Sequence, residues 1–220
     1  MTDTVRYPLV LGLIALTSAA GLAFSYALTR DEIRRQRELE KDRGLAAVFG
    51  IEFDERASER PWRELCSPSE GNGTAGPRVF AATDAKSGHA LYAALGSARG
   101  YSSRVEAIVA VDEIIRSKPE AAHIRAVKIV YQGETPGMGD QCQTPAFQAQ
   151  FDDLLVAHLD IKKDAPYRVA GAPGSEEQEI AAITGATITS NAVIAAVRKA
   201  IDRIRERAAQ QPNNGPGKTP

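Results

Sequence analysis

A long stretch without charge near the N-terminus constrains this chain more than any other feature. Pro8 to Leu28 reads PLVLGLIALTSAAGLAFSYAL. As a helix rising about 1.5 Å per residue, it spans roughly 30 Å, the thickness of the hydrocarbon core of a bilayer. Tyr7 and Tyr26 lie near its ends, where interfacial aromatic residues are common. We therefore predict that residues 1–29 form a single transmembrane anchor in the lipid bilayer.

The main alternative for this stretch is a cleaved signal peptide. The apolar run is longer than the roughly 7–15 residues of a typical signal-peptide core, and no A-x-A cleavage site follows it. We therefore prefer the anchor. The flank before the stretch has Arg6 alone, whereas the flank after it reads RDEIRRQRELEKDR. Counting Lys and Arg by itself would place the large domain in the cytoplasm.

The composition limits the classes of protein to which the chain can belong. With 220 residues, 43% of them hydrophobic, the chain can build a packed core. Its net charge of −1 gives no general attraction to nucleic acid. The histidines, His89, His123 and His158, are isolated, and Cys66 and Cys142 are far apart with no CxxC. We therefore predict no metal site.

The rest of the sequence predicts an α+β domain. We expect a helical stalk at 30–50, a folded domain at 51–209, with a turn-rich loop near its start, and a disordered tail at 210–220. Strand-like runs in close succession predict a mostly antiparallel sheet with packed helices. These runs are residues 78–82, 89–98, 105–112 and 123–132, with a short strand at 166–171 and helices at 145–159 and 191–210.

The turn before the last helix is unusually rich in hydroxyl groups. Ile183 to Val193 reads ITGATITSNAV, and Ser190 or Asn191 is a reasonable N-cap. A helix N-terminus also offers free N–H groups and the positive end of the helix dipole, which suit a phosphate. The residues alone favour a simple cap and do not choose among the hydroxyl groups, which belong to Thr184, Thr187, Thr189 and Ser190.

A second unusual stretch follows a predicted strand. Gly133 to Asp140 reads GETPGMGD, in which proline and glycine impose a tight, exposed turn. Met138 offers an adaptable apolar surface that suits a flat ring. Taken alone, this stretch is best interpreted as a plain connecting loop.

Together the two stretches resemble a known family. The turn ETPGMG at Glu134–Gly139 and the later TGATITS at Thr184–Ser190, behind one membrane helix, are similar to the motifs of the FMN-binding domain family. The run GYSSRVEAIVAVD from Gly100 is also similar. This domain is shared by the G subunit of the Rnf ion-translocating ferredoxin:NAD oxidoreductase and the C subunit of the sodium-translocating NADH:quinone oxidoreductase. The overall length of the chain and the sequence ETPGMGD favour the Rnf type.

The resemblance implies a covalent cofactor. In the family, the last threonine of the late motif carries FMN through a phosphoester bond, and this position is Thr189 here. The other motif residues would shape the phosphate turn or border the flavin ring, and none is expected to be catalytic. These further cofactor-binding residues are Thr184, Gly185, Ala186, Thr187, Ser190, Glu134, Thr135, Gly137, Met138 and Gly139.

The resemblance also implies partners and a location. The chain would relay electrons among other subunits of a membrane complex, after a flavin transferase attaches FMN. The family places the domain outside the cytoplasmic membrane, against the Lys and Arg count. One alternative is a stand-alone anchored flavoprotein. Another is an interaction domain without flavin, because Ala181 stands where the family has an acidic residue and only Glu179 is nearby.

An extracytoplasmic location bears on the two cysteines. An oxidising compartment permits a bridge between Cys66 and Cys142, which would tie the early loop beside the ETPGMGD turn. Two unpaired thiols are the preferred alternative, because the sequence does not show that the two residues are close enough to bond.

Overall fold

The computed structural model divides the chain into two compact units, Met1–Glu40 and Lys41–Pro220. The structure describes residues 3–57, 59–65, 78–84, 88–160 and 180–210. The predicted short strand at 166–171, most of the turn-rich loop and nearly all of the predicted tail lie outside the described residues.

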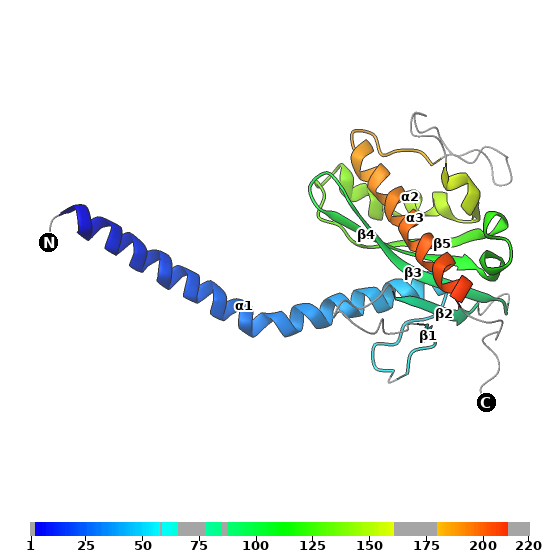
Figure 1. The fold of residues 1–220 in the computed structure, drawn as a ribbon, viewed down its shortest axis with the longest axis horizontal. Helices are drawn as coiled ribbons and strands as arrows, with labels where there is room; N and C mark the ends of the chain where they lie inside the picture. Colours follow the sequence, from blue (N-terminus) through cyan, green and yellow to red (C-terminus); the bar gives the residue numbers. More distant parts are fainter. Residues whose placement is uncertain (1–2, 58, 66–77, 85–87, 161–179, 211–220) are drawn as a thin grey trace. The chain divides into compact units, whose positions relative to one another are not determined.

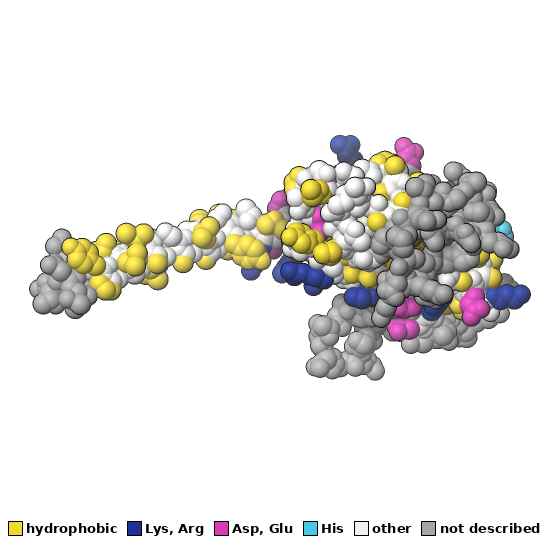
Figure 2. Space-filling model, turned by 90° about the horizontal axis from the view of Figure 1, so that it is seen from above, with side chains coloured by type: hydrophobic (Ala, Val, Ile, Leu, Met, Phe, Trp, Pro, Cys, Tyr) yellow, Lys and Arg dark blue, Asp and Glu magenta, His cyan; other side chains and the backbone are white. Residues whose placement is uncertain are grey.

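Helix α1 runs without a break over Asp3–Phe49. Within the described residues it is the one helix long and apolar enough to cross a membrane. Its apolar side chains are exposed along this segment, as for Leu16 and Phe24, and Figure 2 shows hydrophobic atoms over it. Exposure of this kind suits contact with lipid.

A six-stranded antiparallel sheet forms the centre of the second unit, which confirms the predicted fold class (Figure 1). Its strands follow one another in chain order, so each neighbouring pair is joined by a local connection. The long central pair aligns Ala94 with Val109. The strands are β1 (Arg63–Glu64), β2 (Val79–Thr83), β3 (Ala90–Arg99), β4 (Arg104–Asp112), β5 (His123–Tyr131) and β6 (Leu154–Leu155).

Both faces of the central strands are buried, which explains why their sequences are almost continuously apolar. On β4, Val109 packs in the larger core, whereas Ile108 packs in a smaller core on the opposite face. The smaller core includes Leu45 and Phe49 from the last turns of α1, which belong to the second unit. The larger core is closed by helix α3 (Thr187–Gln210).

Helix α3 lies across β3 and β4 (Figure 1). An apolar stripe along α3 is buried, from Val193 to Ile204. At Gly96 on β3 the helix backbone is so close that an added Cβ would lie 1.9 Å from the carbonyl oxygen of Ala196. A glycine is therefore required at this crossing, and it sets how closely the helix approaches the sheet.

The amphipathic helix predicted over residues 145–159 is wrong. Asp153 has a positive φ of 59°, a left-handed conformation that ends any helix, and its N–H donates to the carbonyl of Ile124 on β5. Pairing with β5 therefore replaces the helix. The segment instead forms α2 (Pro145–Gln148), a 3-10 turn η4 (Ala149–Phe151), β6 and a second 3-10 turn η5 (Val156–Asp160).

The contact at Gly96 yields a stability prediction. Gly96→Ala should lower the free energy of unfolding by about 3 kcal/mol, because the new methyl group forces α3 away from β3. Urea denaturation of the full chain in detergent, followed by circular dichroism, measures the change. Ser97→Ala on the same strand is the matched control and should stay within about 0.5 kcal/mol of wild type. Equal midpoints for both variants would contradict the close crossing.

Candidate functional site

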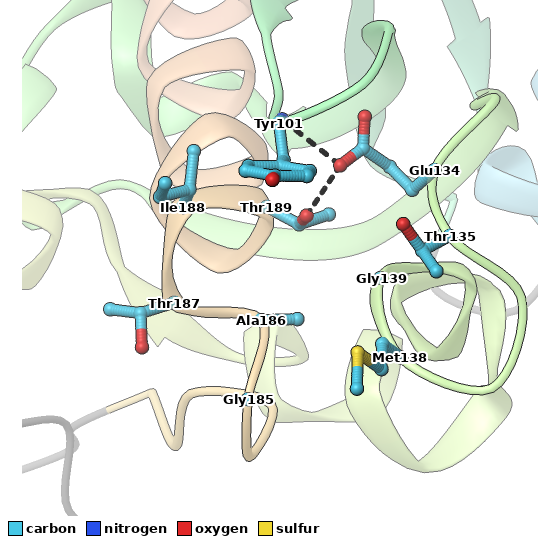
Figure 3. Close-up of a pocket in the computed structure, with 10 residues that line it drawn as sticks. All are labelled: Tyr101, Glu134, Thr135, Met138, Gly139, Gly185, Ala186, Thr187, Ile188 and Thr189. Atoms are coloured by element: carbon cyan, nitrogen blue, oxygen red, sulfur yellow. Dashed lines mark hydrogen bonds between the residues drawn. The ribbon is translucent and has the colours of Figure 1, made fainter.

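The two unusual sequence stretches meet at one cavity of about 600 Å³ (Figure 3). The turn after β5 supplies one wall, and the start of α3 supplies the other. A third segment, the turn between β3 and β4, closes the site with Tyr101. The lining residues are Tyr101, Glu134, Thr135, Met138, Gly139, Gly185, Ala186, Thr187, Ile188 and Thr189.

A buried hydrogen bond joins the two motifs directly. The hydroxyl of Thr189 donates to Oε2 of Glu134 at 2.6 Å, and Figure 3 shows the two side chains pointing toward one another. Thr189 is 1% exposed and Glu134 is 6% exposed. A short bond from a hydroxyl to a buried carboxylate is a strong, charge-assisted contact. It therefore fixes the ETPGMG turn against the first turn of α3.

The turn between β3 and β4 completes the coordination of Glu134. The backbone N–H of Tyr101 donates to Oε2 at 3.0 Å. The N–H groups of Ser102 and Ser103 donate to Oε1 at 3.2 and 2.8 Å, and the Ser103 hydroxyl donates to the same oxygen at 3.2 Å. Every one of these groups is a donor, which only an ionised carboxylate can satisfy at both oxygens.

These contacts set the charge of Glu134. Burial acts to raise the pKa of its carboxyl, but the hydrogen bonds from Thr189, Ser103 and Tyr101 favour the ionised form. The hydrogen bonds prevail, and the pKa of Glu134 lies below its ordinary value. The side chain is therefore a carboxylate at neutral pH.

Gly139 allows the two motifs to approach this closely. An added Cβ at this position would lie 2.9 Å from the Thr189 hydroxyl oxygen and 2.7 Å from Cβ of Glu134. Any side chain there would push the ETPGMG turn off the helix. Gly137 has a positive φ of 77° and serves the turn itself, but it does not line the cavity.

The start of α3 corrects the predicted helix boundary. The helix begins at Thr187 and not at Asn191, and the carbonyl of Ala186 accepts its first backbone hydrogen bond from the N–H of Ser190. Ser190 is therefore inside the helix and is not its N-cap. Its hydroxyl donates to the carbonyl of Ala186 and accepts from the N–H of Ile183, which secures the turn from within.

Burial separates the hydroxyl groups that the sequence could not rank. Thr184 is exposed and lies outside the cavity lining, and Ser190 is buried within the first turn of α3. Thr187 lines the cavity but is exposed. Among the described residues of the motif, Thr189 alone both lines the cavity and donates to a carboxylate.

Two lining residues were not predicted from the sequence. Tyr101 is 68% exposed and Ile188 is 54% exposed, and with Met138 they give the cavity an apolar rim. Tyr101 follows Gly100 in a tight turn between strands, where an aromatic residue needs a reason to be exposed. Ile188 lies between Thr187 and Thr189 at the start of α3. This position in the sequence could have indicated that its side chain is exposed at the site.

Cys142 lies close to the site but is inert. Its thiol is free and fully buried, and burial, together with the negative charges of Glu134 and Asp140, raises its pKa to about 11. The proposed partner, Cys66, lies outside the described residues. The alternative of an unpaired thiol is the state that the structure gives for Cys142.

Comparison with known proteins matches this site to a family. A family model described as the FMN-binding domain matches residues 100–202, which include both motifs and the turn that holds Glu134. This segment of the chain is therefore similar to the FMN-binding domain. The family resemblance inferred from the two motifs is thereby confirmed.

Similar proteins are subunits of ion-translocating oxidoreductase complexes. The G subunit of the ion-translocating oxidoreductase complex of Aliivibrio fischeri (strain MJ11) is 27% identical over 206 residues, or 91% of this chain and 90% of that protein. The G subunit of the proton-translocating ferredoxin:NAD(+) oxidoreductase complex of Clostridium ljungdahlii is 33% identical over 113 residues, or 51% of this chain and 52% of that protein.

A solved structure shares the fold. The crystal structure of NqrC from Shewanella oneidensis matches with a TM-score of 0.54 at 18% identity, covering 81% of this chain and all of that one. The similarity shows that the sheet and its covering helix are a shared architecture.

The lowered pKa of Glu134 yields a prediction about acid stability. A free glutamate titrates near pH 4.3, so a lower pKa in the folded domain gives stability that is present above about pH 5. That stability is lost as the pH falls through the folded pKa. Glu134→Gln should therefore be less stable than wild type near pH 7, and the gap should narrow toward about pH 3.

Thermal melting of both proteins across this pH range measures the gap. Glu120→Gln removes an exposed carboxylate and is the control for the loss of one negative charge. A gap for Glu134→Gln that stays constant across the range would mean that the carboxylate is not stabilised by its donors.

Proposed function

We propose that this chain is a membrane-anchored flavoprotein subunit that carries FMN on Thr189 through a phosphoester bond. It would relay electrons within an ion-translocating ferredoxin:NAD oxidoreductase complex of the Rnf type. The observation that carries the proposal is the meeting of both family motifs across the bond between Thr189 and Glu134, at the wall of one cavity.

The residues present fit FMN. The cavity volume lies within the range of about 300–1,000 Å³ that is usual for small-molecule sites. Tyr101, Met138 and Ile188 offer apolar surface for a flat ring. The N-terminus of α3 offers free N–H groups and a positive dipole end for a phosphate. FMN, when bound, supplies reversible electron transfer.

Thr189 is the hydroxyl best placed for attachment. Its position in the first turn of α3 holds the oxygen beside the helix N-terminus and at the cavity wall. Thr187 lines the cavity from an exposed position without the contact to Glu134 that fixes Thr189. The turn residues Gly185 and Ala186 complete the wall, and Gly185 has a positive φ of 79° that this turn requires.

The site supports electron relay better than substrate turnover. Among the described residues that line the cavity, none is a histidine, cysteine or lysine that could act as nucleophile or general acid. The rim is apolar and exposed, which suits a flavin edge facing a partner cofactor. The relatives are named as subunits of multisubunit complexes, so NAD, ferredoxin and ion transfer would belong to other subunits.

We place the domain outside the cytoplasm, held at the membrane by residues 1–29 and the stalk at 30–50. Support comes from the apolar exposed part of α1 and from the resemblance to the family. A flavin transferase acting there would attach FMN to the domain at 51–209. The stretch rich in Arg after the apolar segment argues for the opposite side, so the topology needs a direct test.

The attachment residue can be tested with two matched variants. Thr189→Ala should abolish all flavin that survives denaturation, because the acceptor oxygen is gone. Thr189→Ser keeps a hydroxyl at the same place and should keep part of the covalent flavin. In-gel flavin fluorescence and peptide mass spectrometry measure both. FMN mapped to Thr187 or Thr184 in the wild-type chain would contradict the assignment.

The same variant tests the relay. In membranes that contain the assembled complex, Thr189→Ala should stop ferredoxin-dependent NAD reduction while leaving the amount of complex unchanged. If ferredoxin-dependent NAD reduction stays at the wild-type rate while this subunit carries no flavin, the subunit does not relay electrons in the complex.

Topology can be tested independently of the flavin. A reporter enzyme that is active only outside the cytoplasm, fused after Pro220, should be active in whole cells. Deleting Pro8–Leu28 from the same fusion should abolish this activity, since the fusion then lacks its apolar segment. Activity of a cytoplasm-only reporter at the same position would show that the Lys and Arg count predicted the side correctly.

A further inference from the structure

Among the described residues, Glu134 is the one side chain that accepts a hydrogen bond from the Thr189 hydroxyl. Thr189 is 1% exposed, so bulk water has almost no access to its hydroxyl. A serine or threonine hydroxyl is a weak nucleophile at neutral pH and needs a neighbouring base. Among the described residues that line the cavity, Glu134 is the one carboxylate. It already accepts the Thr189 proton in a bond of 2.6 Å.

We propose that Glu134 orients the Thr189 hydroxyl for attack on a flavin donor and takes up its proton as the phosphoester forms. The inference rests on the proposed attachment of FMN to Thr189. By this proposal a residue of the chain, Glu134, takes part in the attachment of FMN to Thr189. The acceptor protein then contributes to the chemistry along with the transferase.

The donor must be an activated phosphate. Condensing a free phosphomonoester with a hydroxyl would require loss of water, so the chemistry calls for a flavin dinucleotide with a pyrophosphate bond. The Thr189 Oγ–P bond forms as the P–O bond to the leaving nucleoside monophosphate breaks. The Thr189 proton passes to Glu134 and then to solvent. No electron is gained or lost.

The geometry holds Glu134 ready for this step. Four donors from the turn of Tyr101, Ser102 and Ser103 fix the carboxylate, so the lone pairs on Oε2 stay aimed at Thr189. Fixing these groups in advance removes the need to reorganise them during the reaction. As the ester forms, the Thr189 donor is lost and a negative phosphate arrives, and both changes increase the affinity of Glu134 for the proton.

The variant Glu134→Gln removes the proton acceptor. The amide can keep its oxygen toward the N–H groups of Ser102 and Ser103, which places its NH₂ group toward Thr189 and removes the acceptor that Oε2 offers to the N–H of Tyr101. The Thr189 hydroxyl then accepts a hydrogen bond in place of donating one, and its proton has no acceptor. Glu134→Asp keeps the carboxylate on a shorter side chain and should restore part of the rate.

The test follows modification of the full-length apo chain in detergent by a flavin transferase with flavin adenine dinucleotide. Intact mass spectrometry gives kcat and KM for the chain as substrate. For Glu134→Gln we expect kcat to fall by about 100-fold, the low end for general base catalysis, with KM within about threefold of wild type. Glu134→Asp should lie between the two.

One variant controls for the loss of a negative charge near the site. Asp140→Asn removes a nearby charge whose Oδ1 is buried without a hydrogen bond among the described residues. This variant should be modified at close to the wild-type kcat. Near-UV circular dichroism confirms folding of each variant at the assay temperature.

The outcomes separate the two proposals. If the wild-type chain takes no flavin at Thr189, the proposed function fails. If the wild-type chain is modified and Glu134→Gln keeps its kcat, or loses rate through KM alone, Glu134 is not the proton acceptor. An equal loss of kcat in Asp140→Asn would also overturn the inference, because the effect would then follow from the loss of any negative charge near the site.

Discussion

The site is organised by a single carboxylate that binds three segments of the chain. Glu134 receives donors from the turn between β3 and β4 and from Thr189 at the start of α3, while it lies itself in the turn after β5. A hydrogen bond to a charged group contributes about 1.5–3 kcal/mol, and a buried carboxylate left without donors is costly. The cavity therefore depends on these donors staying in place together.

The sheet makes this convergence possible. The antiparallel order brings the end of β5 beside the connection between β3 and β4, and α3 crosses β3 and β4 on the larger core. The contact at Gly96 fixes how deeply α3 sits, and Gly139 allows the ETPGMG turn to reach its first turn. Packing in the core and chemistry at the cavity are thus linked through the position of one helix.

A phosphate at this site would lie beside a carboxylate, an arrangement that at first opposes binding. The charge of Glu134 is spread over donors from the turn that holds it, and the N-terminus of α3 offers compensating positive potential. The apolar rim of Tyr101, Met138 and Ile188 adds affinity for a ring that does not depend on charge. The site therefore combines polar groups, at Glu134 and the N-terminus of α3, with an apolar rim.

The sequence by itself determined the membrane-length segment, the antiparallel strands and the two motifs, because each depends on local composition and periodicity. It could not determine the broken helix after Pro145, since Asp153 and β6 obtain their conformation from pairing with β5. Nor could it rank the hydroxyl groups of TGATITS or predict Tyr101 at the cavity. Those depend on burial and on a contact between Glu134 and Thr189, which are far apart in the chain and meet only when the sheet and α3 are assembled.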